Sequence, residues 1–200
     1  MRNKIARVVT KFAKQKSENL SLHVYDFDLT LFRSPEPPKW WEKKVHGHWW
    51  LLPESIGRPF LPDQPVGSKF WNNDVVAQAK ASIQDPDVWA ILCTGRLDKG
   101  DLRYRIAEIL KGNDIDFDEV YLRRGNSVML FKVAVLTDMI SKHNIKSVHL
   151  WEDNDVNIKA YEGVCKKLRI PFFAHKIQPN PTDISHIPEY EYSVLKKKWN

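Results

Sequence analysis

One segment joins an apolar run to a pair of acids: it reads LSLHVYDFDLT, from Leu20 to Thr30. The apolar run predicts a β-strand, and alternation along an extended chain puts Asp26 and Asp28 on the same side as the strand ends. Two carboxylates held this close raise each other's pKa unless a cation relieves them. Mg²⁺ prefers carboxylate oxygens, and open α/β sheets bind ligands at the carboxyl ends of their strands. The segment therefore predicts a metal-dependent site that acts on phosphate.

Later apolar runs alternate with segments of helical periodicity. Strands are expected at residues 88–93, 120–122, 147–151 and 172–174, and helices through residues 102–110, 133–140 and 158–168. The strand segments are almost continuously apolar, as in strands buried on both faces of a sheet. Strands that alternate with helices indicate βαβ units. We expect an α/β protein with a three-layer α/β/α Rossmann-like fold and a mostly parallel sheet.

Residues 33–74 interrupt this alternation with a segment rich in proline and tryptophan. It holds five of the chain's eight tryptophans: Trp40, Trp41, Trp49, Trp50 and Trp71. So many aromatic residues argue against disorder, and an insertion of this length in a compact domain is usually functional. We expect a small cap over the end of the first strand. Its tryptophans either pack as the core of the cap or stack on nucleobases, and both can hold for different tryptophans.

The expected organisation is one domain at residues 19–178, including the cap, between a basic segment at 1–18 and a tail at 179–200. The formal net charge of +6 is concentrated at the ends, because residues 1–16 carry six basic residues and no acid. Lys196, Lys197 and Lys198 add three positive charges near the other end. Basic tails attract polyanions such as RNA or DNA, although solvated charged ends are also common.

The cysteine content and the hydropathy of the sequence indicate the cellular compartment. Two cysteines, Cys93 and Cys165, do not make a disulfide framework, which favours a reducing environment. No apolar run approaches the roughly 18–20 residues of a membrane span. The first residues also lack the apolar core of a secretory signal. We expect a cytoplasmic protein with no membrane partner.

Two further motifs supply groups that suit a phosphate. The segment LCTGR, from Leu92 to Arg96, stands where a strand is expected to end and a helix to begin. There Thr94 offers a hydroxyl, Gly95 allows close approach of the backbone, and the helix start offers free N–H groups. Lys132 stands at the head of another expected helix, where it can balance phosphate charge. Each motif is weak alone, since such segments are more often plain turns or solvated lysines.

A second pair of acids, Glu152 and Asp153, follows the strand expected at residues 147–151. These acids can complete a metal shell, although Asp153 also suits the N-cap of the next helix, which would leave Glu152 as the main acid. His46 and His48 are weak candidates for a metal site, because two histidines lack a third ligand.

Together and in this order, the acid pair, hydroxyl, lysine and second acid pair resemble the haloacid dehalogenase (HAD) phosphohydrolase superfamily. The resemblance covers about residues 20–174, and the tryptophan-rich insertion falls where many members carry a cap. The finer motifs, TGR at 94–96, FK at 131–132 and EDN at 152–154, look like the branch named for Swiss Army Knife RNA repair proteins. That branch is related to the phosphatase domain of polynucleotide kinase-phosphatases.

The resemblance implies a role for each motif residue. Asp26 would be the nucleophile that forms an aspartyl-phosphate, and Asp28 would protonate the leaving oxygen and then activate water. Thr94 and Lys132 would hold the non-bridging oxygens of the phosphate. Arg96 would contact the substrate phosphate or the group attached to it.

The resemblance also implies a Mg²⁺ site. Its ligands would be Asp26, the backbone carbonyl of Asp28, and Asp153, with Glu152 close by or acting through water. The chain departs from the superfamily here, because the fourth motif reads Glu-Asp instead of paired aspartates. Asn157 also stands where the nearer branch tends to have histidine.

The expected function is a Mg²⁺-dependent phosphatase that acts on a phosphorylated substrate, with the 3′-phosphate of an RNA or DNA end as the favoured candidate. Three alternatives stay open: a small-metabolite phosphatase, a metal-dependent nuclease, and a non-catalytic nucleic-acid-binding module on a HAD fold. A two-metal nuclease would not need Thr94 or Lys132 at these places. A decayed phosphatase would most simply have lost Asp26 or Asp28.

Overall fold

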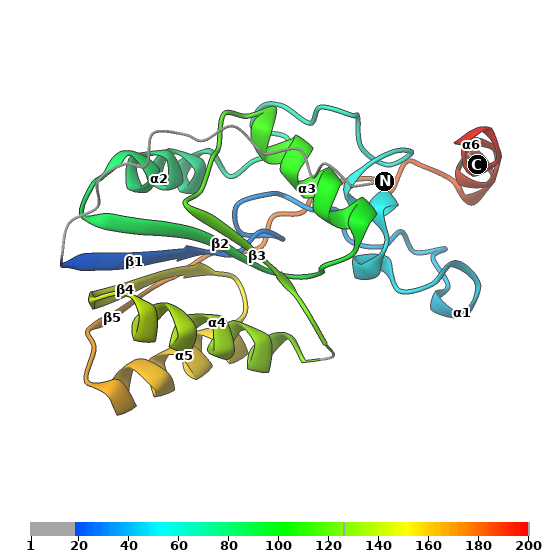
Figure 1. Ribbon diagram of the computed structural model, residues 1–200. Coiled ribbons are helices and arrows are strands. Elements are labelled where there is room, and N and C mark those ends of the chain that lie inside the picture. The colour runs from blue at the N-terminus through cyan, green and yellow to red at the C-terminus, as the bar shows by residue number, and fades with distance from the viewer. Residues whose placement is uncertain (1–18, 126, 200) are drawn as a thin grey trace, which may run out of the picture.

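The computed structural model describes residues 19–125 and 127–199 and shows a five-stranded parallel sheet (Figure 1). The strands lie in the order β3-β2-β1-β4-β5. Their bounds are Leu20–Tyr25 for β1, Val88–Leu97 for β2, Glu119–Arg123 for β3, Ile145–Glu152 for β4 and Phe172–Lys176 for β5. All five expected strands are confirmed, and the basic segment at residues 1–18 lies outside the described residues.

Helices cover both faces of the sheet. Figure 1 shows α2 and α3 on one face, with α4 and α5 on the other. Their bounds are Asn73–Gln84 for α2, Gly100–Lys111 for α3, Val128–Lys142 for α4 and Asp155–Leu168 for α5. The three expected helices are α3, α4 and α5, whereas α2 was not predicted. The three-layer α/β/α Rossmann-like architecture is confirmed.

The central strand β1 supports a core on each face of the sheet. Leu22 and Val24 are buried in the cluster beneath α4 and α5, while Tyr25 is buried in the cluster on the opposite face. β1 pairs in parallel with β2 from Ser21 to Tyr25 and with β4 from Leu20 to Tyr25. Its two polar residues, Ser21 and His23, are only partly exposed and form hydrogen bonds with Ser147 and Ser82.

The strand order determines where a ligand can bind. The chain builds β2 and β3 on one side of β1 and then crosses to build β4 and β5 on the other. Such a reversal opens a crevice at the carboxyl ends of the strands on either side of it. Here those strands are β1 and β4, which end at the two acid pairs.

The segment after β1 forms the cap. It contains α1 (Lys43–His46) and the short 3₁₀ helices η1 (Trp49–Leu51) and η2 (Pro53–Ile56). Four of its tryptophans donate their indole N–H to backbone carbonyls: Trp40 to Ile187, Trp41 to Gly47, Trp49 to Pro35 and Trp71 to Pro65. These four side chains therefore pack the cap, as one of the two interpretations of the sequence expects.

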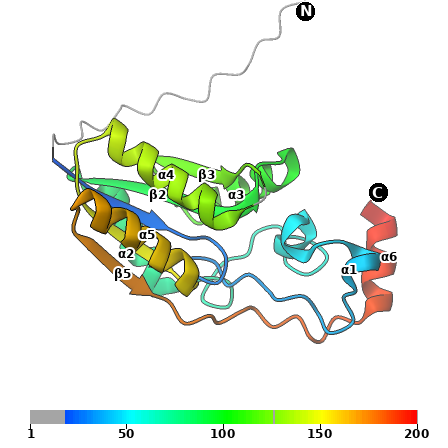
Figure 2. The same cartoon turned by 90° about the horizontal axis from the view of Figure 1, so that it is seen from below.

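The chain returns to the cap after β5. Residues 179–199, which the sequence analysis assigns to a tail, include helix α6 (Glu189–Trp199) beside α1 (Figure 2). Tyr192 of α6 is buried, and its ring stacks on Phe60 of the cap at 5.4 Å between ring centroids. No described helix is long and apolar enough to cross a membrane.

Candidate active site

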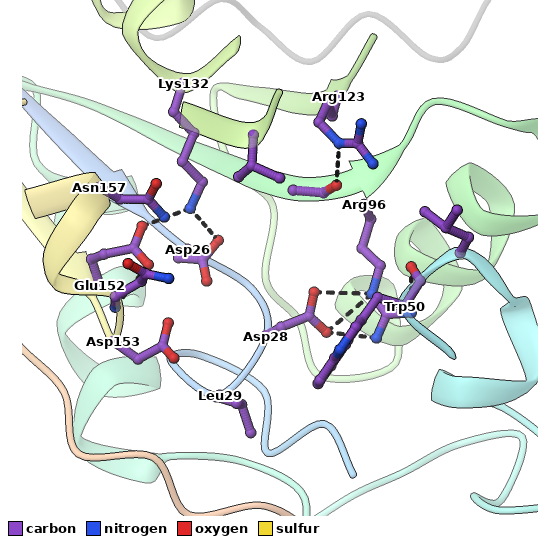
Figure 3. A pocket seen from close by; sticks show the side chains of 14 residues that line it. Asp26, Asp28, Leu29, Trp50, Arg96, Arg123, Lys132, Glu152, Asp153 and Asn157 are labelled. Carbon is purple, nitrogen blue, oxygen red and sulfur yellow. Dashed lines mark hydrogen bonds and ion pairs between the residues drawn. The ribbon is translucent and has the colours of Figure 1, made fainter. Parts of the chain in front are cut away.

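A pocket of about 270 Å³ lies at the carboxyl ends of the central strands (Figure 3). It is lined by four carboxylates and three basic side chains: Asp26, Asp28, Glu152, Asp153, Arg96, Arg123 and Lys132. The lining therefore carries a formal charge of −1 when every group is ionised. A phosphate dianion would be repelled from this pocket unless a further cation entered with it.

Lys132 joins the two acid pairs. Its Nζ lies 2.6 Å from Asp26 Oδ1 and 2.6 Å from Glu152 Oε2, and all three side chains are buried. Lys132 lies in the second turn of α4, which begins with Ser127 as its N-cap. The lysine expected at the head of a helix is therefore brought into direct contact with the expected nucleophile.

These contacts change the pKa values of the buried groups. Burial raises the pKa of Asp26 well above its ordinary value, and the charges of Glu152 and Asp28 act in the same direction against Lys132. Burial alone would lower the pKa of Lys132, but Asp26 and Glu152 outweigh it and raise that pKa. One lysine thus serves two carboxylates, which leaves negative charge for another cation to neutralise.

Asp28 points to a different partner. Arg96 donates to its carboxylate from Nε at 2.9 Å and from Nη2 at 2.7 Å. The hydroxyl of Ser34 adds a third contact at 2.6 Å. Asp26 and Asp28 therefore project into one pocket but contact different cations, Lys132 and Arg96 (Figure 3). The turn directly after Asp28 places Leu29 at φ 60°, a left-handed conformation that is uncommon for a residue other than glycine.

Arg96 is 1% exposed, and its guanidinium binds Asp28 and the cap. Its Nη1 donates to the backbone carbonyl of Trp50 at 3.2 Å and to the hydroxyl of Ser55. The sequence analysis expects Arg96 to contact the substrate, and the structure places it in the pocket wall beside the expected general acid. A fixed, bidentate arginine of this kind orients a carboxylate.

The expected boundary at the TGR segment is wrong. Residues 94–96 belong to β2, which continues to Leu97, and α3 begins only at Gly100. The strand is irregular here, because its register with β3 shifts between Thr94 and Leu97. Thr94 is fully buried, and its hydroxyl accepts from the backbone N–H of Arg96 at 3.2 Å. Gly95, rather than Thr94, lines the pocket.

Three carboxylates are placed to hold a metal ion. One oxygen from each of Asp26, Glu152 and Asp153 lies within 4.8 Å of the others. Burial and the charge of Glu152 raise the pKa of Asp153 to about 6. Three hard oxygen donors that repel one another suit Mg²⁺. The N-cap of α5 is Asn154, so Asp153 is not the cap that the alternative interpretation expects.

Trp50 and Arg123 line the pocket, although the sequence analysis assigned no role to Arg123. Arg123 ends β3, and a basic residue directly after an apolar run was the available signal. Asn157 of α5 also lines the pocket. His46 is packed against Trp41 at 4.8 Å between ring centroids, within the cap.

The fold and the order of the site residues define an α/β protein of the HAD type. The family model described as HAD domain family 1 in Swiss Army Knife RNA repair proteins matches residues 39–197. The chain belongs to this family, in agreement with the resemblance of its motifs.

Solved structures of low sequence identity share the fold. A chain of the Pnkp1/Rnl/Hen1 complex is 16% identical, with a TM-score of 0.51 over 88% of this chain and 53% of that chain. The HAD domain of effector protein Lem4 from Legionella pneumophila is also 16% identical, with a TM-score of 0.50 over 90% of this chain and 94% of that chain.

A curated relative comes from Saccharomyces cerevisiae. The uncharacterized protein YMR265C is 22% identical over 175 residues. The alignment covers 75% of this chain but only 38% of the yeast protein.

Proposed function

We propose that the chain is a Mg²⁺-dependent phosphatase that works through an aspartyl-phosphate on Asp26. The observation that carries the proposal is the separation of the two acids that follow β1. Asp26 contacts Lys132 at 2.6 Å beside Glu152, whereas Asp28 binds Arg96 on the other side of the pocket. Two carboxylates with different surroundings suit two different chemical roles.

In the first step, a carboxylate oxygen of Asp26 attacks phosphorus, and the bond between phosphorus and the leaving oxygen breaks. Asp28 gives its proton to that leaving oxygen. Lys132 stabilises the negative charge on the phosphoryl oxygens, together with the backbone of Gly95, which lines the pocket.

In the second step, water attacks phosphorus of the aspartyl-phosphate and Asp28 takes up the proton of that water. The bond between phosphorus and the Asp26 oxygen breaks, which returns the carboxylate and releases inorganic phosphate. Arg96 holds the Asp28 carboxylate in place through both proton transfers.

Asp26, Asp153 and Glu152 would hold Mg²⁺, with the backbone carbonyl of Asp28 as a further ligand. The bound ion would neutralise charge on the phosphate and on these carboxylates. Its two positive charges would change the formal charge of the pocket lining from −1 to +1. The pocket would then attract a phosphate dianion.

The proposed substrate is the phosphorylated end of a nucleic acid, with a 3′-phosphate favoured. Membership of a family named for RNA repair proteins supports this choice, as does the shared fold with a chain of the Pnkp1/Rnl/Hen1 RNA repair complex. In the cytoplasm, an enzyme of this kind would prepare RNA ends for joining.

The test is release of inorganic phosphate with and without Mg²⁺, from matched oligonucleotides that carry a 3′- or a 5′-phosphate and from glycerol phosphate. We expect Mg²⁺-dependent release, fastest from the 3′-phosphate, that Asp26→Asn abolishes. Faster release from glycerol phosphate would favour the small-metabolite phosphatase. Cleavage within the strand would favour the nuclease, and binding without any release would favour the non-catalytic module.

A further inference from the structure

Trp50 differs from the four tryptophans that pack the cap. Its side chain is 36% exposed, whereas that of Trp49, next to it in η1, is 4% exposed. Its indole N–H makes no hydrogen bond to any residue that the structure describes. It lines the pocket that contains Asp26 and Asp28. A large aromatic ring is thus presented to the space that a substrate would enter.

The ring of Trp50 is held in place by Arg96. The guanidinium of Arg96 lies 5.2 Å from the ring centroid, and Arg96 Nη1 donates to the Trp50 carbonyl at 3.2 Å. Arg96 is itself fixed by Asp28. An exposed ring that is already immobilised can stack on a flat ligand with little further loss of entropy.

Arg123 provides a second, independent observation. Its side chain is 8% exposed, and it donates from Nε to the carbonyl of Gly95 at 2.8 Å and from Nη1 to the carbonyl of Gly125. No carboxylate of the described residues forms an ion pair with it, in contrast to Arg96 and Lys132. A buried charge without a counter-ion is costly, so this arginine points to an anionic ligand.

Trp50, Arg96 and Arg123 lie together on one side of the pocket, and Lys132, Glu152, Asp153 and Asn157 lie on the other (Figure 3). The side with Lys132 is the proposed site of phosphoryl transfer. The side with Trp50 is therefore available to hold the remainder of the substrate, which would extend past Asp28.

We propose that Trp50 and Arg123 form a subsite for the leaving nucleic-acid strand. Trp50 stacks on the terminal base, and Arg123 binds the phosphodiester next to it. This inference rests on the proposed function and adds to it the recognition of the strand. Because every base has a π-face and every strand repeats the phosphate, such a subsite accepts single-stranded ends of any sequence. A phosphotyrosyl peptide would present a ring but would leave Arg123 without its anion.

The test separates the two contacts by comparing substrates. An oligonucleotide 3′-phosphate has a terminal base and a phosphodiester, the same strand with an abasic end lacks the base, and a nucleoside 3′-monophosphate lacks the phosphodiester. Trp50→Ala should reduce the preference for the base-bearing end over the abasic end by about 10- to 100-fold in kcat/KM. Trp50→Phe, which keeps a ring, should retain most of that preference.

Arg123→Gln should reduce the preference for the oligonucleotide over the nucleoside monophosphate by about 10-fold and weaken the dependence on salt. Arg124→Gln is the matched control, because Arg124 pairs with Asp98 and its side chain is 81% exposed. It should leave this preference unaltered.

Affinity is measured separately, by fluorescence anisotropy of the same three substrates, each carrying a fluorescent label, with each variant in an Asp26→Asn background. The subsite is supported if Trp50→Ala loses affinity only for the substrates that carry a terminal base, and Arg123→Gln only for those that carry a phosphodiester. This result would support the subsite even if the wild type releases no phosphate and the proposed function fails. Equal losses on all three substrates, no loss at all, or a preference for a phosphotyrosyl peptide would overturn the subsite while leaving the phosphatase proposal to stand on turnover.

Discussion

The guanidinium of Arg96 binds the carboxylate of Asp28 side-on, with Nε 2.9 Å from Oδ2 and Nη2 2.7 Å from Oδ1. The same arginine donates to Ser55 and to the carbonyl of Trp50 in the cap. The position of the proposed general acid is therefore coupled to the position of the cap. The cap thereby helps to hold the proposed general acid in place.

Replacement of this arginine should impair proton transfer more than phosphate binding. Arg96→Lys keeps the charge but cannot form the bidentate contact, so we expect kcat for glycerol phosphate to fall about 100-fold. The fall should be smaller for 4-nitrophenyl phosphate, whose leaving group departs without a proton. Steady-state kinetics on the two substrates measure this difference. Ser55→Ala removes one contact of Arg96 and should give a weaker effect of the same kind. Equal losses of kcat on both substrates would contradict the proposed role of Arg96 in positioning Asp28 for proton transfer.

The carboxylate cluster predicts a specific metal dependence. Asp153→Asn removes one charged donor from the group formed with Asp26 and Glu152. The Mg²⁺ concentration for half-maximal activity should rise by about 10- to 100-fold, as when a group that supports a metal site is lost. Isothermal titration with Mg²⁺ gives the same comparison without turnover. The control is Asp138→Asn, because Asp138 pairs with Lys142 on α4 and neither residue lines the pocket.

Helix α6 should contribute to the stability of the cap. Tyr192 is 2% exposed and packs against Phe60, Trp41 and Trp40, with ring centroids 5.3 to 5.6 Å apart. Tyr192→Ala should lower the free energy of unfolding by about 3 kcal/mol, because it opens a cavity among aromatic rings. Tyr190→Ala, at a position two residues earlier in α6 that is 68% exposed, should cost no more than about 0.5 kcal/mol. Urea denaturation of both variants checks the difference, and equal effects would contradict the packing.

Acid should destabilise the protein through histidines on the face of the sheet where His23 contacts Ser82 of α2. Burial, and then the neighbouring His149 and His175, lower the pKa of His23 to about 4. The ring of His23 lies 4.6 Å from the ring of His149, between centroids, and forms a hydrogen bond with Ser82. The charge of Asp85 acts in the other direction and raises the pKa of His23, but it is the smallest of these effects. The unfolded chain, where a histidine titrates near 6.5, binds the proton more readily.

The contribution of His23 to stability is therefore complete above pH 6.5 and is lost as the pH falls from 6.5 toward 4. The loss should be on the order of 2 kcal/mol after allowance for partial exposure. Denaturant unfolding of His23→Phe across this range should show a shallower pH dependence than the wild type. The difference in the free energy of unfolding between the two proteins at pH 7.5 reports the change in packing alone. If the two free energies fell in parallel as the pH is lowered, His23 would not be the group responsible.

Much of the fold could be predicted because its signals are local. β1 is a largely apolar segment that stops just before Asp26, and its alternate residues Leu20, Leu22 and Val24 are all buried. Helix α2 lacked this signal, because its buried face includes Ala79 and Ser82, which are small or polar. Helix α6 places Tyr192 in the core, and one aromatic residue is too little to indicate a helix.

The site could be predicted only in part, because some contacts join distant residues. The motif order placed Asp26, Lys132 and Glu152 at one edge of the sheet, and the structure brings them together. The pairing of Arg96 with Asp28 joins residues 68 positions apart and depends on the irregular end of β2. The position of Arg123 depends on the same irregularity, because its side chain donates to the carbonyl of Gly95.

The central claim is that Asp26 receives the phosphoryl group. Rapid mixing of the Asp28→Asn variant with 4-nitrophenyl phosphate and Mg²⁺ tests it most directly, because the first step with this substrate needs no acid and the second step lacks its base. The account predicts a burst of nitrophenolate stoichiometric with the protein, slow turnover afterwards, and a phosphoryl group on the acid-quenched peptide that contains Asp26. A burst of the same size from the double variant, which carries both Asp26→Asn and Asp28→Asn, would contradict the claim that Asp26 is the nucleophile.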